Sequence, residues 1–182
     1  MAKRQVFFSF HYEEDVWRVG QVRNIGTIEG QPIFSDNGWE KIRRTSDESI
    51  KRWIDKEMTM RSCVVVLIGE HTASRKWVKY EIEQAWKKGK GVVGIYIHKL
   101  EKSQKQHANK GNNPFDLFYV DKTINYISER DNPIDANDIK LSSVIKAYEP
   151  PYVTSNVVYQ DIQDNIEDLI EEAIAIRNRY PK

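Results

Sequence analysis

The sequence predicts a single α/β domain with a central, mostly parallel sheet flanked by helices. Residues 63–68 and 91–97 are too continuously apolar for strands with one wet face, so we expect central strands covered on both sides. One amphipathic segment with helical spacing precedes residues 63–68, and another lies between residues 63–68 and 91–97. Strands that alternate with helices imply right-handed crossovers and parallel pairing. At 182 residues, the chain suits one domain with a sizeable core.

The chain opens with a predicted strand, loop and helix. Residues 6–10 form a compact apolar run, and the polar stretch that follows can start a helix. Within residues 16–25, valines recur at helical spacing, which places Arg18 and Arg23 on the wetter side. Residues 33–34 are expected to form a short second strand.

A capping signal marks the next helix. Thr45-Ser-Asp-Glu48 matches a capping box, in which a hydroxyl and a glutamate satisfy exposed backbone N–H groups. Apolar residues continue at helical spacing after it, at Ile50, Trp53, Ile54 and Met58. We therefore expect a helix over this segment.

The second half of the chain is less regular until its last segment. Residues 98–113 turn polar and are predicted to form a solvated loop, although a loop over a cleft could also contact phosphate. Residues 123–127 fit a short strand and residues 138–148 fit a helix. A long amphipathic helix over about residues 162–177 packs either on this domain or on a partner.

Charge and composition argue against several classes of function. Lys and Arg number 28 against 27 Asp and Glu, and the net charge of +1 gives no global field for attracting nucleic acid or an anionic membrane. Cys63 is the only cysteine and can form no intramolecular disulfide, which fits a reducing compartment. The N-terminus lacks the long apolar region of a signal peptide, and no segment reaches membrane-spanning length. We expect a cytoplasmic protein without nucleic-acid or membrane partners.

Several common catalytic patterns are missing. The Gly-x-x-x-x-Gly-Lys-Ser/Thr phosphate loop is absent, and Gly89-Lys-Gly91 is better explained as a turn between helix and strand. The four histidines show no metal-ligand spacing, so we predict no metal. A triad of Ser9, His11 and Asp36 can be written down, but Ser9 lacks the glycine elbow that projects a nucleophile.

Trp77-Val-Lys-Tyr-Glu81 is the most informative segment. It lies on a predicted helix directly after the strand at residues 63–68, and so presents a carboxylate beside aromatic rings where open α/β sheets bind ligands. At about 100° per residue, Glu81 falls roughly 85° from the centre of the helix's apolar arc. Glu81 can therefore be half-buried and still reach a cleft. The alternative is an ordinary boundary glutamate paired with Lys79 or Lys88.

Three segments, taken in order, carry a family resemblance. They are Val6-Phe-Phe-Ser-Phe-His11, Cys63-Val-Val-Val-Leu-Ile-Gly69 and Trp77-Val-Lys-Tyr-Glu81. Together they resemble the TIR domain, in particular the TIR-like group of bacterial anti-phage systems, whose Trp-x-x-x-Glu helix carries the catalytic glutamate in enzymatic members. Ser35-Asp-Asn-Gly-Trp39 looks like the family's variable loop after the second strand. One departure is Val78, where many TIR enzymes carry a cysteine.

The resemblance implies both a fold and an activity. The fold is a single flavodoxin-like (TIR-like) domain over residues 1–182, with a core of about 4–130 and a C-terminal helical extension of about 137–180. The activity is that of an NAD glycohydrolase/ADP-ribosyl cyclase, which cleaves the nicotinamide-ribose bond of NAD and makes a cyclic ADP-ribose isomer. NAD is the substrate, with no cofactor. In this group the product is a second messenger that activates a companion effector in anti-phage defence, and the enzyme self-associates on activation.

The same resemblance assigns candidate site residues. Glu81 is the implied catalytic residue, because a carboxylate can hydrogen-bond the ribose hydroxyls and stabilise the positive charge that develops on the ribose. Aromatic rings would provide stacking surface, and polar groups would contact ribose or phosphate. The candidate substrate-binding residues are Ser9, Phe10, His11, Arg23, Asn24, Asp36, Trp39, Trp77 and Tyr80.

Two other functions remain open from the sequence. A TIR adaptor would use the same fold only to bind other TIR domains, and it needs no carboxylate at Glu81. An enzyme such as a nucleoside deoxyribosyltransferase also sets a glutamate against a ribose on a related fold, and a comparison of NAD with free deoxynucleosides as substrates would separate it from an NAD-cleaving TIR enzyme.

Overall fold

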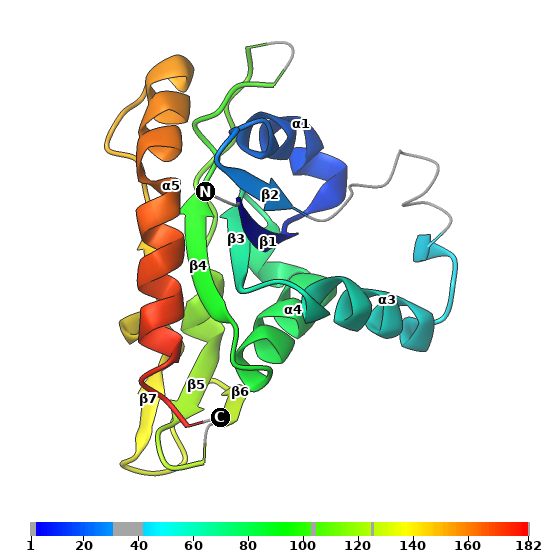
Figure 1. Ribbon diagram of the computed structural model, residues 1–182, viewed down its shortest axis with the longest axis vertical. Helices are drawn as coiled ribbons and strands as arrows, with labels where there is room; N and C mark the ends of the chain where they lie inside the picture. Colours follow the sequence, from blue (N-terminus) through cyan, green and yellow to red (C-terminus); the bar gives the residue numbers. More distant parts are fainter. Residues whose placement is uncertain (1–2, 31–41, 103–104, 125, 182) are drawn as a thin grey trace.

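The centre of the protein is a five-stranded sheet in which every neighbouring pair of strands is parallel. The structure is a computed structural model, which describes residues 3–30, 42–102, 105–124 and 126–181. The strand order is flavodoxin-like, and helices lie on both faces of the sheet (Figure 1). The predicted α/β fold class is therefore confirmed. In spatial order the strands are β2 (Ile28–Gly30), β1 (Arg4–Ser9), β3 (Cys63–Ile68), β4 (Gly91–Tyr96) and β8 (Ala147–Tyr148).

Apolar side chains fill the space on both sides of this sheet. On one face they pack against α1 (Tyr12–Arg23) and α5 (Ser155–Arg177). On the other they pack against α3 (Asp47–Thr59) and α4 (Lys76–Lys87). Because both faces are covered, all residues of the two central strands β3 and β4 are buried, which explains their continuous apolar sequences.

A second sheet of three antiparallel strands was not predicted from the sequence. Its order is β6 (Tyr126–Glu129), β5 (Phe118–Asp121), β7 (Asp138–Lys140), and its apolar side joins the core layer of α4. The strand predicted at residues 123–127 shares only residues 126–127 with β6.

The helix predicted at residues 138–148 is wrong. That segment holds β7, the 3₁₀ turn η3 (Leu141–Ser143) and β8, the edge strand of the main sheet. Asp138 is clamped by the guanidinium of Arg130, at 2.6 Å, and by the backbone N–H of Ile134, at 2.7 Å. These contacts and the pairing with β5 favour extended backbone over the helical alternative.

Two other local predictions differ from the structure. The N-cap of α3 is Ser46, not Thr45: the Ser46 hydroxyl accepts the N–H of Ser49 at 3.3 Å, whereas the Thr45 hydroxyl donates to the carbonyl of Ile42. The helix itself is present as predicted. The expected strand at residues 33–34 lies outside the described residues, and β2 precedes it in the sequence.

Helix α5 packs on this domain's own sheet. Its apolar residues from Ile162 to Ala173 are buried against β4 and α1. Gly91 permits a close approach, because a Cβ there would lie 2.8 Å from the backbone nitrogen of Ile174. At the helix end, buried Arg177 donates to the carbonyl of Trp86, the last turn of α4, from both Nε (3.0 Å) and Nη2 (2.9 Å). The apolar stripe of α5 is thus used within the domain.

Among the described residues, no helix combines the length and the apolar composition required to cross a bilayer.

Candidate active site

Glu81 is buried and its carboxylate accepts a hydrogen bond from the hydroxyl of Ser9. Helix α4 supplies Glu81, and the last residue of β1 supplies Ser9, which pairs with Val66 of β3. The glutamate is only 8% exposed, less than its helical position suggested, and Ser9 is fully buried. The fold thus brings together two candidate residues that are 72 positions apart in the sequence.

The alternative pairing of Glu81 with a neighbouring lysine does not occur. Lys79 pairs with Glu129 of the second sheet, and Lys88 pairs with Asp55 of α3 at 2.9 Å. Glu81 is therefore a buried carboxyl group held by a neutral hydroxyl rather than a surface glutamate in an ion pair.

Burial changes the acidity of Glu81. Loss of contact with water raises the pKa of Glu81 to about 8, and the hydrogen bond from Ser9 acts in the opposite direction. A carboxyl group with a pKa near neutrality can be either protonated or ionised, depending on what approaches it. That is the property required of an acid, base or charge-stabilising group in an enzyme.

The loop after β3 is shaped so that α4 starts close to β1. The hydroxyl of Thr72 accepts the N–H of Gly69 at 2.8 Å and donates to the carbonyl of Leu67 at 3.4 Å, which turns the chain into the 3₁₀ turn η1 (Thr72–Ser74) ahead of α4. Gly69 is required there because a Cβ would lie 2.1 Å from the carboxylate of Asp15 in α1. β1 and β3 are also the strands between which the direction of winding reverses, the usual ligand position in this fold.

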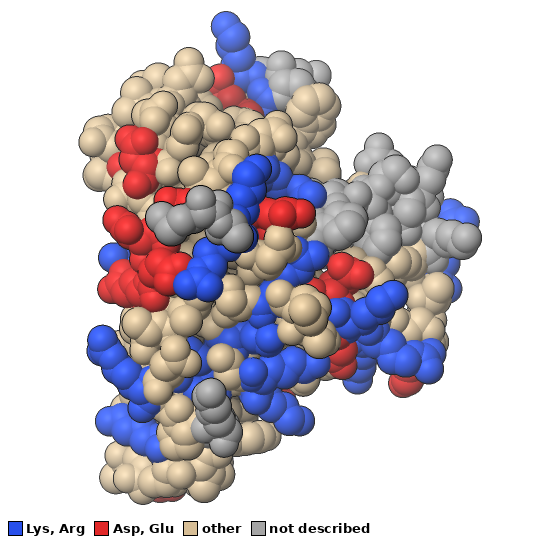
Figure 2. Space-filling view, in the orientation of Figure 1, with Lys and Arg blue, Asp and Glu red and all other residues tan. Residues whose placement is uncertain are grey.

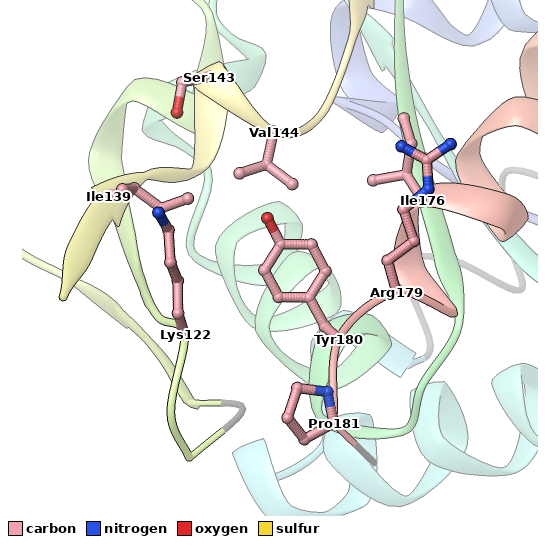
Figure 3. Close-up of a pocket in the computed structure, with 8 residues that line it drawn as sticks. All are labelled: Lys122, Ile139, Ser143, Val144, Ile176, Arg179, Tyr180 and Pro181. Atoms are coloured by element: carbon pink, nitrogen blue, oxygen red, sulfur yellow. The ribbon is translucent and has the colours of Figure 1, made fainter.

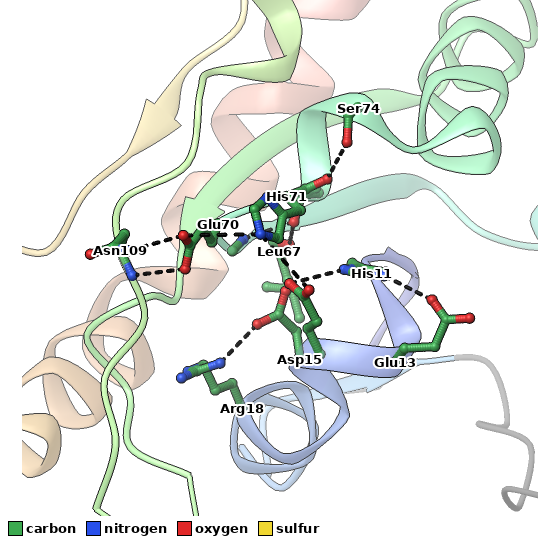
Figure 4. Close-up of polar contacts among 12 residues, drawn as sticks. His11, Glu13, Asp15, Arg18, Leu67, Glu70, His71, Ser74 and Asn109 are labelled. Carbon is green, nitrogen blue, oxygen red and sulfur yellow. Dashed lines mark hydrogen bonds and ion pairs between the residues drawn. The ribbon is translucent and has the colours of Figure 1, made fainter.

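Charged residues gather at this edge of the sheet (Figure 4). His11 is buried, with Nε2 2.9 Å from the carboxylate of Glu13 and Nδ1 3.3 Å from that of Glu14. Asp15 and Arg18 are both almost fully buried and pair at 3.0 Å. Burial raises the pKa of Asp15, and the adjacent guanidinium of Arg18 partly offsets this effect.

A polar crevice of about 240 Å³ opens beside this cluster. Arg18 donates to the carbonyls of Leu100, at 2.7 Å, and Gln106, at 3.2 Å, and so ties the polar segment after β4 to α1. The side-chain amide of Asn109 adds a bond to Glu70 at 2.9 Å. The described residues that line the crevice are Glu14, Asp15, Arg18, Glu70, His71, Lys102, Gln106, His107 and Ala108.

The remaining candidate residues fall into separate places. Phe10 follows β1 at the same edge as Ser9, and its ring centroid lies 6.2 Å from that of Tyr12. Trp77 and Tyr80 contact each other edge-on at 6.0 Å, and the Tyr80 hydroxyl donates to Asp55 of α3 at 3.3 Å. These two rings line a hollow of about 370 Å³ on the α3 side, not the crevice beside His71.

Arg23 and Asn24 are not brought to Glu81. They lie at the end of α1, whose twelve residues run about 18 Å away from the edge where Ser9 lies. The guanidinium of Arg23 instead lies 5.9 Å from the ring centroid of Phe8. Asp36 and Trp39 lie outside the described residues.

Sequence reasoning missed part of the crevice. Arg18 was expected on the wet side of α1, but only 2% of its surface is exposed. A usable signal was the spacing of Asp15 and Arg18, three residues apart on one helix, which allows an ion pair to be buried as a unit. Glu70 and His71 carried no comparable signal, because their roles depend on the loop geometry. Within the described residues, no group of three or more His, Cys, Asp or Glu side chains is placed to hold a metal.

A flavodoxin-like parallel sheet, with a buried glutamate on the helix after its third strand facing the end of the first, is the arrangement of a TIR-like domain. Residues 7–102 match the family described as "Thoeris protein ThsB, TIR-like domain". The match spans more than half of the chain, and the chain belongs to this family.

One curated relative is a Bacillus cereus (strain MSX-D12) protein named "Putative cyclic ADP-D-ribose synthase ThsB1". It is 40% identical over 121 residues, which cover 64% of this chain and 62% of the relative. The chain thus matches less than two thirds of that relative's length.

Proposed function

We propose that this protein cleaves the nicotinamide-ribose bond of NAD and joins the ribose to another atom of the same molecule, giving a cyclic ADP-ribose isomer. The observation that carries the proposal is buried Glu81, paired with Ser9 at the ligand-binding edge of the sheet. Membership of the Thoeris ThsB TIR-like family and the name of the B. cereus relative support the same activity.

The reaction fits a single carboxyl group. The bond between C1′ of the ribose and the nicotinamide nitrogen breaks, nicotinamide leaves as a neutral molecule, and positive charge develops on the ribose as in glycoside hydrolysis. A leaving group that departs neutral needs no acid. What the site must provide is a negative charge near the ribose, in a place from which water is excluded.

The buried position of Glu81 suits this role. With a pKa of about 8, Glu81 is mostly protonated at neutral pH in the present conformation. The nicotinamide ring of NAD carries a positive charge, and an approaching positive charge lowers the pKa of a carboxyl group. Substrate therefore favours the ionised form of Glu81, which then hydrogen-bonds the ribose hydroxyls in place of Ser9.

Ring closure completes the reaction. A nucleophilic atom of the adenosine half attacks C1′, forms the new bond and gives up its proton, so the products are nicotinamide, a cyclic isomer of ADP-ribose and a proton. This outcome requires that the adenosine half reach C1′ before water does.

We place the enzyme in the cytoplasm, where NAD is present and where free, buried Cys63 stays reduced. In this proposal the product is a diffusible messenger for a companion effector, and self-association accompanies activation.

The test is mass spectrometry of NAD and its products in phage-infected cells that lack the companion effector. Cells expressing the wild type should accumulate a species with the mass of cyclic ADP-ribose, and Glu81→Gln should abolish it, with a loss of at least about a hundredfold. The matched control is Glu83→Gln, the same change on the same helix at a half-exposed position. NAD consumption that survives Glu81→Gln would refute the catalytic assignment. No change in NAD or its products under infection would favour the adaptor function.

A further inference from the structure

A second pocket lies between the end of α5 and the second sheet (Figure 3). Its volume is about 540 Å³, within the usual range for small-molecule sites. It is separate from the candidate active site, because none of the residues that line it is a candidate site residue. Tyr180 on its wall packs edge-on at 5.1 Å against Trp86, in the last turn of α4. The lining residues are Lys122, Ile139, Ser143, Val144, Ile176, Arg179, Tyr180 and Pro181.

One part of this pocket is apolar and can hold a flat ring. Ile139 of β7, Val144 just after η3 and Ile176 of α5 are half-buried aliphatic side chains. The ring of Tyr180 stands between them with its hydroxyl directed towards Val144 (Figure 3). An aromatic face beside aliphatic walls stacks well with nucleobases, because every base presents a π-face.

The rest of the pocket provides positive charge. Lys122 lies on one side of Tyr180 and Arg179 on the other (Figure 3). Within the part of the chain that the structure describes, neither cation forms an ion pair or a side-chain hydrogen bond, and the Tyr180 hydroxyl has no hydrogen-bond partner. In Figure 2, Lys and Arg side chains are also dense on the lower half of the surface, where Figure 1 shows the end of α5 and the second sheet. Two cations and a phenol hydroxyl are the donors that a phosphate group accepts from.

We propose that this pocket binds a nucleoside monophosphate, with its base against Tyr180 and the aliphatic walls and its phosphate reached by the exposed side chains of Lys122 and Arg179 (Figure 3). A flat base alone would leave the cations unused, and inorganic phosphate alone would leave the apolar walls unused. The proposal is independent of NAD chemistry at Glu81, since it requires binding only.

Calorimetric titration of the full chain with adenosine 5′-monophosphate tests this site, with adenosine and inorganic phosphate as separate probes. We expect saturable binding of the monophosphate, at least about tenfold tighter than of either part. The double variant Lys122→Met/Arg179→Met should weaken it at least about tenfold, because both charges are lost while an unbranched apolar side chain remains at each position. Lys140→Met, an exposed β7 lysine that does not line the pocket, should leave affinity within about twofold.

Two comparisons distinguish binding in this pocket from binding at the active site or at a surface anion contact. Glu81→Gln should still bind the monophosphate; binding that is lost in Glu81→Gln and kept in the double variant would assign it to the active site and overturn the proposal. Equal affinity for phosphate alone would also overturn it, since that shows only a surface anion contact. So would the absence of saturable binding at millimolar concentrations. Because the double variant changes exposed side chains, its fold is expected to survive, and a thermal melt checks this.

Discussion

Replacing Glu81 by glutamine should make the protein more stable at high pH. Glutamine keeps the shape and can still accept the Ser9 hydrogen bond, but it has no charge to bury. The pKa of Glu81 rises from 4.5 in the unfolded chain to about 8 in the folded one, because burial disfavours the ionised form. Between these values the folded state keeps a proton that the unfolded state loses, so the free energy of unfolding of the wild type falls as the pH rises.

The size of the effect follows from the same two pKa values. At about 1.4 kcal/mol for each pH unit between them, ionising Glu81 costs the folded state of order 5 kcal/mol by about pH 8. Below about pH 4.5 the glutamate is protonated in both states and the cost disappears. The Glu81→Gln variant should therefore match the wild type at low pH and exceed its stability progressively between these limits.

Urea unfolding at a series of pH values from about 5 to about 9 measures this directly. The quantity to compare is the difference in free energy of unfolding between Glu81→Gln and the wild type at each pH. Glu83→Gln, the same change at a half-exposed position of the same helix, serves as the control. A difference for Glu81→Gln that stays constant across the range would refute the reasoning, because the buried carboxyl group would then not titrate abnormally.

Two further predictions concern how α5 is held. Gly91→Ala should destabilise the protein by about 2 kcal/mol, because its Cβ would meet the backbone of α5, whereas Gly20→Ala, with open space around its Cβ, should be neutral or stabilising by up to about 1 kcal/mol in thermal or urea unfolding. Arg177→Met should cost about 3 kcal/mol in urea unfolding, because the carbonyls of Trp86, Tyr180 and Pro181 lose their buried donor; an unchanged midpoint would show that these carbonyls find other partners.

The central strands of the main sheet could be predicted because their signals are local. β3 and β4 are recognisable as buried strands from six consecutive residues each, and α3 and α4 from apolar residues at helical spacing. The second sheet gave only a weak signal, the short strand predicted at residues 123–127, which overlaps β6 at residues 126–127. β7 has three residues, and it is extended because it pairs with β5 and because Arg130 clamps Asp138, neither of which is visible in the local pattern.

The candidate site was predictable only in part. Helical geometry placed Glu81 on the flank of a buried face, but its full burial depends on the end of β1, 72 residues earlier. Arg18 looked exposed because α1 was treated as a helix with one wet side. It is buried because the segment after β4 crosses over it and offers the carbonyls of Leu100 and Gln106. Contacts between segments so distant in sequence leave no periodicity to read.

The tie between Arg177 and Trp86 joins residues 91 positions apart, and this separation bears on how the protein is made. One face of β4 is covered by α5, so during synthesis that face stays uncovered until some eighty further residues have left the ribosome. Contacts over such separations form slowly, and an unpaired apolar strand face is prone to aggregate while it waits. We therefore expect translation speed and chaperone supply to influence the yield of folded protein.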